Sequence, residues 1–324
     1  MKILVVGLGS MGKRRIRLIK EAAPEAALIG VDGRADRREE ASGLGLACYE
    51  TLQEAFDREQ DIECAFISTS PLSHAGLIES CLKQGLHVFT ELNLTADGYQ
   101  ENMKLAEKAG KVLFLSSTFL YRREIEYIQK RVHDYGSPVN YTYHVGQYLP
   151  DWHPWENYRQ FFVGDKRTNG CREILAIEMP WIIRTFGEIT QVLAFRDRRS
   201  DLQIDYDDSY QIMIRHRNGS RGVFCVDVVS PKAVRNLEIM AEHFYLSWDG
   251  KPTGIEIFED GHTEAVKVYQ HARHQSGYQP TIVEDAYLTE IEEFFKTVNG
   301  EISPRYGFAD DLETLRWIDR IEEV

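Results

Sequence analysis

Short apolar runs alternate with amphipathic stretches through residues 1–120. This alternation is typical of buried strands followed by helices. It predicts strands at 2–6, 27–31, 64–68, 87–90 and 112–116, and helices at 37–44, 74–84 and 97–109. The first run, KILVV, is apolar throughout, as expected of a strand buried on both faces of a parallel sheet. The pattern predicts βαβ units with right-handed crossovers. We therefore expect an α/β fold, with an N-terminal Rossmann domain of doubly wound parallel sheet over residues 1–120.

The pattern changes after residue 120, where polar and apolar positions alternate within successive strands. Strands are predicted at 141–149, 189–195, 209–217, 221–229 and 237–247, with Asn218 and Gly219 forming a hairpin turn. Helices are predicted at 171–186, 281–298 and 310–322. The helix at 171–186 is apolar on nearly every side, so we expect it to be buried between the domains. Residues 121–324 are predicted to form an α+β domain with an open, mostly antiparallel sheet, and the last helices could pack back on the first domain.

Composition excludes several functional classes. The chain has 324 residues, 43% hydrophobic and 27% charged, which is typical of a globular protein. Its 51 acidic and 38 basic residues give a net charge of −13, which disfavours nucleic acid as a partner. No apolar run is long enough for a signal peptide or a membrane span, so we expect a cytoplasmic protein without a membrane partner. The five cysteines have no CxxC spacing, so neither disulfides nor a metal site is predicted.

A glycine motif lies between the first predicted strand and the following helix. Gly7, Gly9 and Gly12 form GxGxxG. In this context Gly7 permits a tight turn, Gly9 lets the backbone approach a diphosphate, and Gly12 lets the helix pack close to the strand. The first helical residues, Ser10 and Met11, would offer N–H groups to the anion. The alternative is a glycine turn that only joins a strand to a helix.

The residues after the second strand bear on cofactor choice. Asp32 lies about 20 residues beyond Gly12, where a carboxylate can accept from ribose hydroxyls and repel a 2′-phosphate. Asp32 therefore favours NAD. Arg34 could instead turn towards a 2′-phosphate, so NADP stays open, although Arg34 could equally face solvent.

Several segments of the sequence resemble the Gfo/Idh/MocA oxidoreductase family. They are KILVVGLGSMGKRR, ISTSPLSHAGLIESCLKQGLHVFTE, FLYRR at 119–123 and the terminal helices. The resemblance implies a family fold in which Thr69, Ser70, His74 and Glu91 line the cofactor, with Glu91 near the nicotinamide ribose. It also implies that Tyr121 and Arg122 lie near the substrate, though Arg122 could equally be a structural tie.

The sequence departs from this family at the proton-transfer positions. Family enzymes usually follow the glutamate with a lysine that bonds the reacting hydroxyl, whereas Leu92 follows Glu91 here. A family aspartate and histidine on the central helix correspond to Ile174 and Ile177. Losing a positioned acid or base costs about 100- to 10,000-fold in rate, so the family's sugar-alcohol mechanism does not transfer directly.

Other residues could replace the missing groups. Glu178 lies in the apolar helix beside Pro180, and apolar surroundings would raise its proton affinity. The alternative is an ion pair between this glutamate and an arginine such as Arg172 or Arg184. His153 is the second candidate, because the ordinary pKa of histidine lies near neutrality.

An aromatic segment, GQYLPDWHPWENYR at 146–159, predicts a binding surface for a sugar-like small molecule. Trp152 and Trp155 could pack on sugar rings, and Arg159 could bind a carboxylate or phosphate. The alternative is a loop clamped on its own domain or on a second subunit.

The sequence supports three functions. The first is an NAD(P)-dependent oxidoreductase acting on a carbinol or carbonyl carbon of a sugar or sugar nucleotide. The second is a catalytically inactive dinucleotide-binding sensor or regulator. The third is a reductase of a conjugated bond, as the family member biliverdin reductase is. A homodimer or homotetramer formed through the C-terminal sheet is expected in each case.

Overall fold

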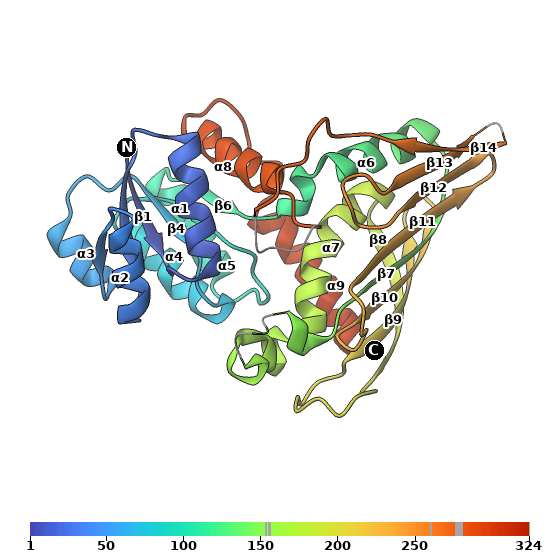
Figure 1. The fold of residues 1–324 in the computed structure, drawn as a ribbon, viewed down its shortest axis with the longest axis horizontal. Coiled ribbons are helices and arrows are strands. Elements are labelled where there is room, and N and C mark those ends of the chain that lie inside the picture. Colours follow the sequence, from blue (N-terminus) through green and yellow to red (C-terminus); the bar gives the residue numbers. More distant parts are fainter. Residues whose placement is uncertain (153, 155–156, 260, 276–280, 324) are drawn as a thin grey trace. The chain divides into compact units, whose positions relative to one another are not determined.

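The computed structural model describes residues 1–152, 154, 157–259, 261–275 and 281–323 (Figure 1). His153 and Trp155 therefore lie outside the described residues. The chain divides into two compact units. Unit 1 comprises Met1–Ser117 and Tyr287–Leu312, and unit 2 comprises Thr118–Ala286 and Glu313–Val324.

Unit 1 contains a six-stranded parallel sheet in the order β3-β2-β1-β4-β5-β6. The strands are β1 (Lys2–Val6), β2 (Ala27–Val31), β3 (Ala47–Tyr49), β4 (Cys64–Ile67), β5 (His87–Thr90) and β6 (Leu113–Leu115). The helices are α1 (Ser10–Ala22), α2 (Ala35–Gly43), α3 (Leu52–Arg58), α4 (His74–Lys83) and α5 (Tyr99–Ala109). The strand order reverses between β1 and β4, which confirms the predicted doubly wound sheet.

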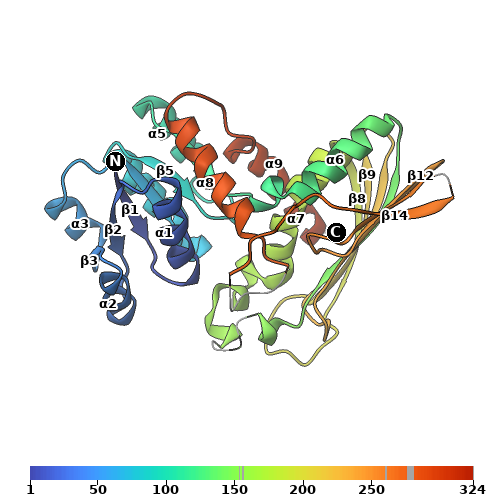
Figure 2. The ribbon, with the colours of Figure 1, turned by 45° about the horizontal axis from the view of Figure 1, so that its top comes forward.

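A helix from the end of the chain completes the core of unit 1. Helix α8 (Glu284–Val298) lies beside α1 (Figure 2), with the Arg14 guanidinium 4.5 Å from the centre of the Tyr287 ring. The Phe294 ring meets Phe66 and Phe89 edge-on, with centroids 5.2 and 5.6 Å apart. These apolar contacts hold α8 against β4 and β5.

Unit 2 is built on an eight-stranded sheet in the order β14-β13-β12-β11-β7-β10-β9-β8. Among the described strands of this eight-stranded sheet, only β7 and β10 pair in parallel, which confirms an open, mostly antiparallel sheet. The strands are β7 (Asn140–Gly146), β8 (Ile189–Asp197), β9 (Ser209–His216), β10 (Arg221–Asp227), β11 (Val234–Ala241), β12 (Phe244–Trp248), β13 (Ile255–Glu259) and β14 (His262–Val266). Their inward residues form one core layer, as β9 illustrates, where buried and exposed residues alternate along the strand.

Helices cover one face of this sheet (Figure 1). They are α6 (Arg123–Tyr135), α7 (Gly170–Phe186) and the end of α9 (Phe308–Glu323). Helix α7 is the predicted apolar helix, and within unit 2 it packs against β9 and β10. One-turn 3-10 helices fill the connections: η1 (Pro71–Ser73), η2 (Thr118–Tyr121), η3 (Leu149–Asp151), η4 (Tyr158–Gln160), η5 (Phe162–Gly164) and η6 (Lys166–Thr168).

Two predicted strands differ from the structure. The single strand expected at 237–247 is the hairpin β11–β12, because the chain reverses at His243 with a left-handed φ of 60°. The turn contains no glycine or proline to mark it. The strand expected at 141–149 ends at Gly146, and Leu149 and Pro150 already belong to η3. The hairpin at Asn218 and Gly219 is confirmed, with Gly219 at φ +95°.

Candidate functional site

The glycine motif lies where the strand order of unit 1 reverses. Gly7 follows β1 with φ +89°, a conformation that favours glycine. A Cβ on Gly7 would lie 2.6 Å from the Ser68 carbonyl oxygen and 2.8 Å from Thr69 Cγ2. The loops after β1 and β4 therefore touch at this glycine. In open α/β sheets, ligands bind in the crevice at such a reversal.

The start of α1 has the features that a diphosphate requires. A Cβ on Gly12 would lie 1.9 Å from the Gly7 carbonyl oxygen, so only glycine allows this close approach of helix and loop. Gly9 is the N-cap residue of α1, and no side chain caps the helix there. The N–H groups of the first turn have no acceptor within the helix. The cradle around Gly7, Gly9 and Gly12 thus fits a dinucleotide diphosphate.

Asp32 joins the glycine loop to the end of β2. Its Oδ2 accepts a hydrogen bond from the Leu8 N–H at 2.8 Å, and its Oδ1 accepts from the Arg34 N–H at 2.9 Å. The Arg37 guanidinium lies 3.5 Å from the same carboxylate. This is the position from which a carboxylate can also accept from the hydroxyls of an adenosine ribose.

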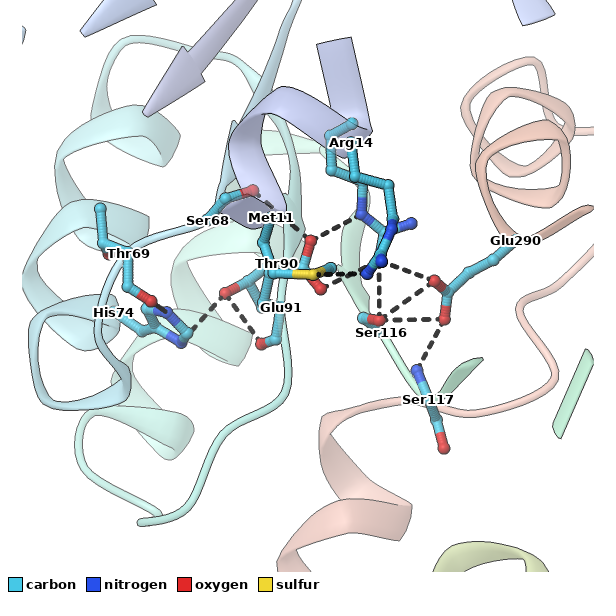
Figure 3. Close-up of polar contacts among 11 residues, drawn as sticks. Met11, Arg14, Ser68, Thr69, His74, Thr90, Glu91, Ser116, Ser117 and Glu290 are labelled. Atoms are coloured by element: carbon cyan, nitrogen blue, oxygen red, sulfur yellow. Dashed lines mark hydrogen bonds and ion pairs between the residues drawn. The ribbon is translucent and has the colours of Figure 1, made fainter. Parts of the chain in front are cut away.

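A buried network of charged side chains is centred on Arg15, in the first half of α1. Arg15 on α1 is fully buried, and it donates to both carboxylate oxygens of Glu91 at 2.6 and 2.9 Å. It also donates to Glu290 at 2.9 Å and to the Ser116 hydroxyl at 3.1 Å. Glu290 in turn accepts from the Ser117 N–H at 2.7 Å. The resulting cluster of Glu91, Ser116, Ser117 and Glu290 is visible in Figure 3.

The network keeps Arg15 charged and Glu91 in a fixed orientation. Burial alone would lower the pKa of the Arg15 guanidinium, but the carboxylates of Glu91 and Glu290 raise it above its ordinary value. Burial raises the pKa of Glu290, and Arg15 opposes that effect. The Glu91 carboxylate therefore faces a permanent positive charge. Sequence reasoning missed Arg15 and Glu290, although an arginine on the apolar side of α1 is a signal that could have revealed the first.

His74 supports the neighbouring loop. One ring nitrogen, Nε2, lies 3.0 Å from the Thr69 carbonyl oxygen, and the other lies 2.7 Å from Asn93 Oδ1. Burial lowers the pKa of His74, which favours the neutral ring. Because the ring is buried, His74 positions Thr69 within this structure. Thr69, beside the Gly7 turn, is half-buried, and Ser70 is exposed. Their contact with a cofactor stays a prediction.

Glu178 forms a second buried charge cluster, within unit 2. Its carboxylate accepts from the Tyr143 hydroxyl at 2.7 Å, the Trp181 indole at 2.6 Å and the Arg235 guanidinium at 2.8 Å. The partner arginine is thus Arg235 on β11, while Arg172 pairs with Asp319 at 2.5 Å. The sequence predicted an arginine of the same helix as the partner, whereas the partner in the structure is an arginine of the sheet, 57 positions away in the chain. Pro180 lies inside α7 as expected.

Glu173, one turn earlier on α7, has a different environment. The residue is half-buried, but its Oε2 atom is covered and has no hydrogen-bond partner in the described part of the chain. Burial raises the pKa of the Glu173 carboxyl to about 8. It can therefore exchange a proton near neutral pH, a property that the sequence predicted for Glu178.

The predicted substrate residues differ in their burial and in their contacts. Arg122 is buried, donates to the Gly250 carbonyl at 3.0 Å and stacks on Trp248 at 5.2 Å. These contacts lie within unit 2, so both the predicted contact of Arg122 with substrate and the alternative tie across the domain interface stay predictions. Tyr121 is also buried. The Trp152 indole donates to the Gln147 carbonyl at 3.1 Å, and Arg159 is exposed.

No group of three or more histidine, cysteine, aspartate or glutamate residues in the described ranges is arranged to hold a metal ion. Among the described helices, none has the length and apolar character needed to cross a membrane.

Comparison with known proteins identifies the class of the N-terminal fold. Residues 1–117 match the family GFO_IDH_MocA, described as "Oxidoreductase family, NAD-binding Rossmann fold". Unit 1 thus has an NAD-binding fold of the oxidoreductase type. Residues 1–117 are thus similar to the Gfo/Idh/MocA family, as the resemblance implied.

Individual relatives extend the similarity over more of the chain. Human biliverdin reductase A is 29% identical over 203 residues, which is 62% of this chain and 63% of that protein. The alignment thus spans less than two thirds of this relative. A biliverdin reductase from Synechocystis, solved with biliverdin and NADP+, has a TM-score of 0.78 at 16% identity, covering 99% and 98% of the chains. A UDP-N-acetylglucosamine 3-dehydrogenase from Acidithiobacillus ferrooxidans has a TM-score of 0.76 at 18% identity, covering 100% and 97%. The two structures establish similarity of fold.

Proposed function

We propose that this protein is an NAD(P)-dependent oxidoreductase that reduces a conjugated bond of an apolar, unsaturated substrate. One observation carries the cofactor assignment. The backbone around Gly7, Gly9 and Gly12 leaves no room for side chains on the first and last of these glycines, and Asp32 stands beside it. This cradle suits a diphosphate with an adenosine ribose at its side.

The chain's own residues would act at both ends of the dinucleotide. The N–H groups at Gly9, Ser10 and Met11 would bind the diphosphate, and Asp32 would orient the adenosine ribose. Glu91, held by Arg15, would orient the nicotinamide ribose. When bound, the nicotinamide supplies or accepts a hydride. A Glu91 side chain that Arg15 holds in place favours one orientation of the ring, because its acceptor atoms cannot turn away.

The substrate class is inferred from the residues that replace the family's proton-transfer groups. Leu92, Ile174 and Ile177 are apolar where sugar-alcohol dehydrogenases of the family carry ionisable side chains. Adding a hydride to a conjugated bond does not require a base that removes a carbinol proton. The similarity to a biliverdin reductase over 203 residues supports the same class.

A sugar nucleotide is the second candidate substrate. The aromatic segment 146–159 favours it, because Trp152 is only half-buried and Arg159 is exposed for contact with a phosphate. The similar fold of the UDP-N-acetylglucosamine dehydrogenase is consistent with this candidate. His153 and Trp155 stay predicted contacts.

The proton-transfer group is proposed to be a glutamate of α7. Glu178 is the group that the sequence favoured, but its carboxylate already accepts hydrogen bonds from three donors of unit 2. Glu173 has a covered oxygen without a partner and a pKa raised to about 8. Measuring the turnover of Glu173→Gln and of Glu178→Gln as a function of pH distinguishes these two candidates. If the pH profile of turnover loses its fall near pH 8 in Glu173→Gln but keeps it in Glu178→Gln, Glu173 is the proton-transfer group.

The proposed function is tested by cofactor binding and turnover. NADH and NADPH fluorescence titrations measure binding, and loss of nicotinamide absorbance with biliverdin or with UDP-N-acetylglucosamine measures turnover. We expect binding and turnover with biliverdin or a related conjugated substrate. Turnover with the sugar nucleotide alone would favour the second candidate. Binding of NADH or NADPH without turnover of either substrate would favour the sensor or regulatory function. The apolar residues Leu92, Ile174 and Ile177 motivate that function as well.

We further propose that a second copy of the chain covers the open face of the unit 2 sheet. Leu193, Met213 and Val223 are opposite one another in the register of β8, β9 and β10, and all are exposed. Phe195 beside them is 75% exposed. Such a continuous apolar stripe is typical of an interface. Light scattering should give a dimer or tetramer, and Met213→Lys should dissociate it, whereas a monomeric native protein would contradict the proposal.

A further inference from the structure

The ion pair between Arg235 and Glu178 in unit 2 is exposed on its positive side only. The Arg235 side chain is 20% exposed, whereas that of Glu178 is fully buried. Nε and Nη2 of Arg235 both donate to the same oxygen, Glu178 Oε1, at 3.1 and 2.8 Å. A guanidinium carries five N–H groups, and Glu178 does not use those of Nη1. The part of this ion pair that solvent reaches is therefore a cation with unused donors.

The Glu178 carboxylate has other donors besides Arg235. Its second oxygen, Oε2, accepts from the Tyr143 hydroxyl at 2.7 Å and from the Trp181 indole at 2.6 Å. Each carboxylate oxygen is thus hydrogen-bonded without Arg235 Nη1. Arg235 can bind a second acceptor through Nη1 while Glu178 keeps its own bonds.

The surroundings of Arg235 hold its side chain in one orientation. The Arg235 guanidinium carbon lies 4.7 Å from the centre of the Phe119 ring, a geometry in which the aromatic ring attracts the cation. A Cβ on Gly250 would lie 2.7 Å from Arg235 Cβ, so the turn at Gly250 packs directly on the arginine stem. A side chain that is already fixed loses little conformational freedom when it binds an anion.

The side chains next to Arg235 are aromatic. Phe119, in η2, is half-buried, and its ring centre also lies 4.9 Å from the Arg122 guanidinium carbon. Arg122 pairs with Glu124, and its side chain is 4% exposed. Of the two arginines against Phe119, Arg235 is thus the one that a ligand can reach. Aromatic rings suit a planar conjugated molecule, and a guanidinium suits a carboxylate.

We propose that Arg235 binds a carboxylate of the conjugated substrate through Nη1, with the Phe119 ring beside that bond. This inference rests on the proposed function, to which it adds that the substrate is an acid. The carboxylate accepts hydrogen bonds from Arg235, and Glu178 retains Nε and Nη2. Arg235 is a binding residue in this arrangement and takes no part in hydride or proton transfer.

The first test changes the ligand. Biliverdin carries carboxylate groups, and its dimethyl ester has the same conjugated skeleton without them. All five tryptophans lie in unit 2, so quenching of tryptophan fluorescence measures the binding of each compound. We expect the native protein to bind biliverdin about 10- to 100-fold more tightly than the ester, the range of hydrogen bonds to charged groups. Equal affinities would overturn the role of Arg235.

The second test changes Arg235 and Glu178 together, so that neither charge is left buried without its partner. In Arg235→Gln/Glu178→Gln, biliverdin should bind only as tightly as the ester, within about threefold, and the affinity for the ester should stay at its native value. Arg235→Lys keeps the charge but has a single nitrogen to share, so it should recover part of the preference for the acid. A native preference in the double variant would overturn the assignment.

Arg196→Gln is the matched control. Arg196, on β8, is 23% exposed and pairs with Asp207 at 3.3 Å, so its exposure is close to that of Arg235. The control should retain the native preference for the acid, and a loss equal to that of the double variant would overturn a specific role of Arg235.

Turnover separates this inference from the proposed function. If the native protein reduces biliverdin but binds acid and ester equally, the role of Arg235 is overturned and the oxidoreductase function stands. If it binds neither compound and reduces neither, the conjugated substrate itself is overturned, and the role of Arg235 with it.

Discussion

Arg15 is expected to be the most sensitive charged residue of unit 1. It is fully buried, and it donates to Glu91 at 2.6 and 2.9 Å, to Glu290 at 2.9 Å and to Ser116 at 3.1 Å. Arg15→Met keeps much of the apolar stem but leaves two carboxylates side by side without their cation. Removing one partner of a buried ion pair costs about 3–5 kcal/mol. We expect the free energy of unfolding of unit 1 to fall by that amount.

A second substitution tests the mechanism of this loss. In Arg15→Met/Glu290→Gln, one of the two orphaned carboxylates is neutral, so part of the stability should return. The coupling energy between the two sites should be at least about 1 kcal/mol, as found for residues of one network. Lys13→Met is the control on the same helix. Lys13 pairs with Glu40 on the surface, with side chains 40% and 57% exposed, so its loss should cost less than about 1 kcal/mol.

The assay must report on unit 1. All five tryptophans lie outside its residue ranges, so tryptophan fluorescence would follow unit 2. Urea unfolding is therefore followed by hydrogen exchange of peptides from β1 and β4, with far-UV circular dichroism for the whole chain. If Arg15→Met cost no more than Lys13→Met, the idea that this network holds Glu91 in place would be refuted.

Two further predictions concern a glycine and a carboxyl group. Gly12→Ala would place a methyl 1.9 Å from the Gly7 carbonyl oxygen, so it should abolish dinucleotide binding, as measured by NADH titration. Gly76→Ala, in α4 with no atom within 4 Å, should instead stabilise the protein by about 0.5–1 kcal/mol in the urea assay; a loss of binding there would contradict the steric argument. Glu173→Gln tests the raised pKa through stability. The folded-state pKa of about 8 exceeds the unfolded value, so the native protein should lose stability as the pH rises from about 4.5 to 8. The variant should match it near pH 4 and exceed it by about 2–4 kcal/mol at pH 8; parallel pH profiles would show that the carboxyl is not perturbed.

The parallel sheet of unit 1 was predictable because its strands are short and continuously apolar. KILVV at β1 and the GxGxxG turn after it are local signals, and the structure places both as expected. The sharp turn at His243 was not predictable, because neither glycine nor proline marks it. Strand β7 ended before its predicted limit, since Pro150 and the η3 turn interrupt the extended chain.

The charge networks of the site could not be read from local spacing. Glu290 lies 275 positions from Arg15 in the chain, and Arg235 lies 57 positions from Glu178. A carboxylate on an apolar helix indicates that a cation is needed, but the fold decides which one approaches. For Glu178 the sequence offered Arg172 and Arg184, whereas the β11 strand brings Arg235. Burial of single atoms, such as Glu173 Oε2, also emerges only from tertiary packing.

The most direct measurement is a crystal structure of the protein with NADH or NADPH at saturating concentration. The account predicts density for the diphosphate within hydrogen-bond distance of the N–H groups at Gly9–Gly12, with the adenosine ribose beside Asp32. A dinucleotide bound elsewhere, or a glycine loop without density at saturation, would contradict it.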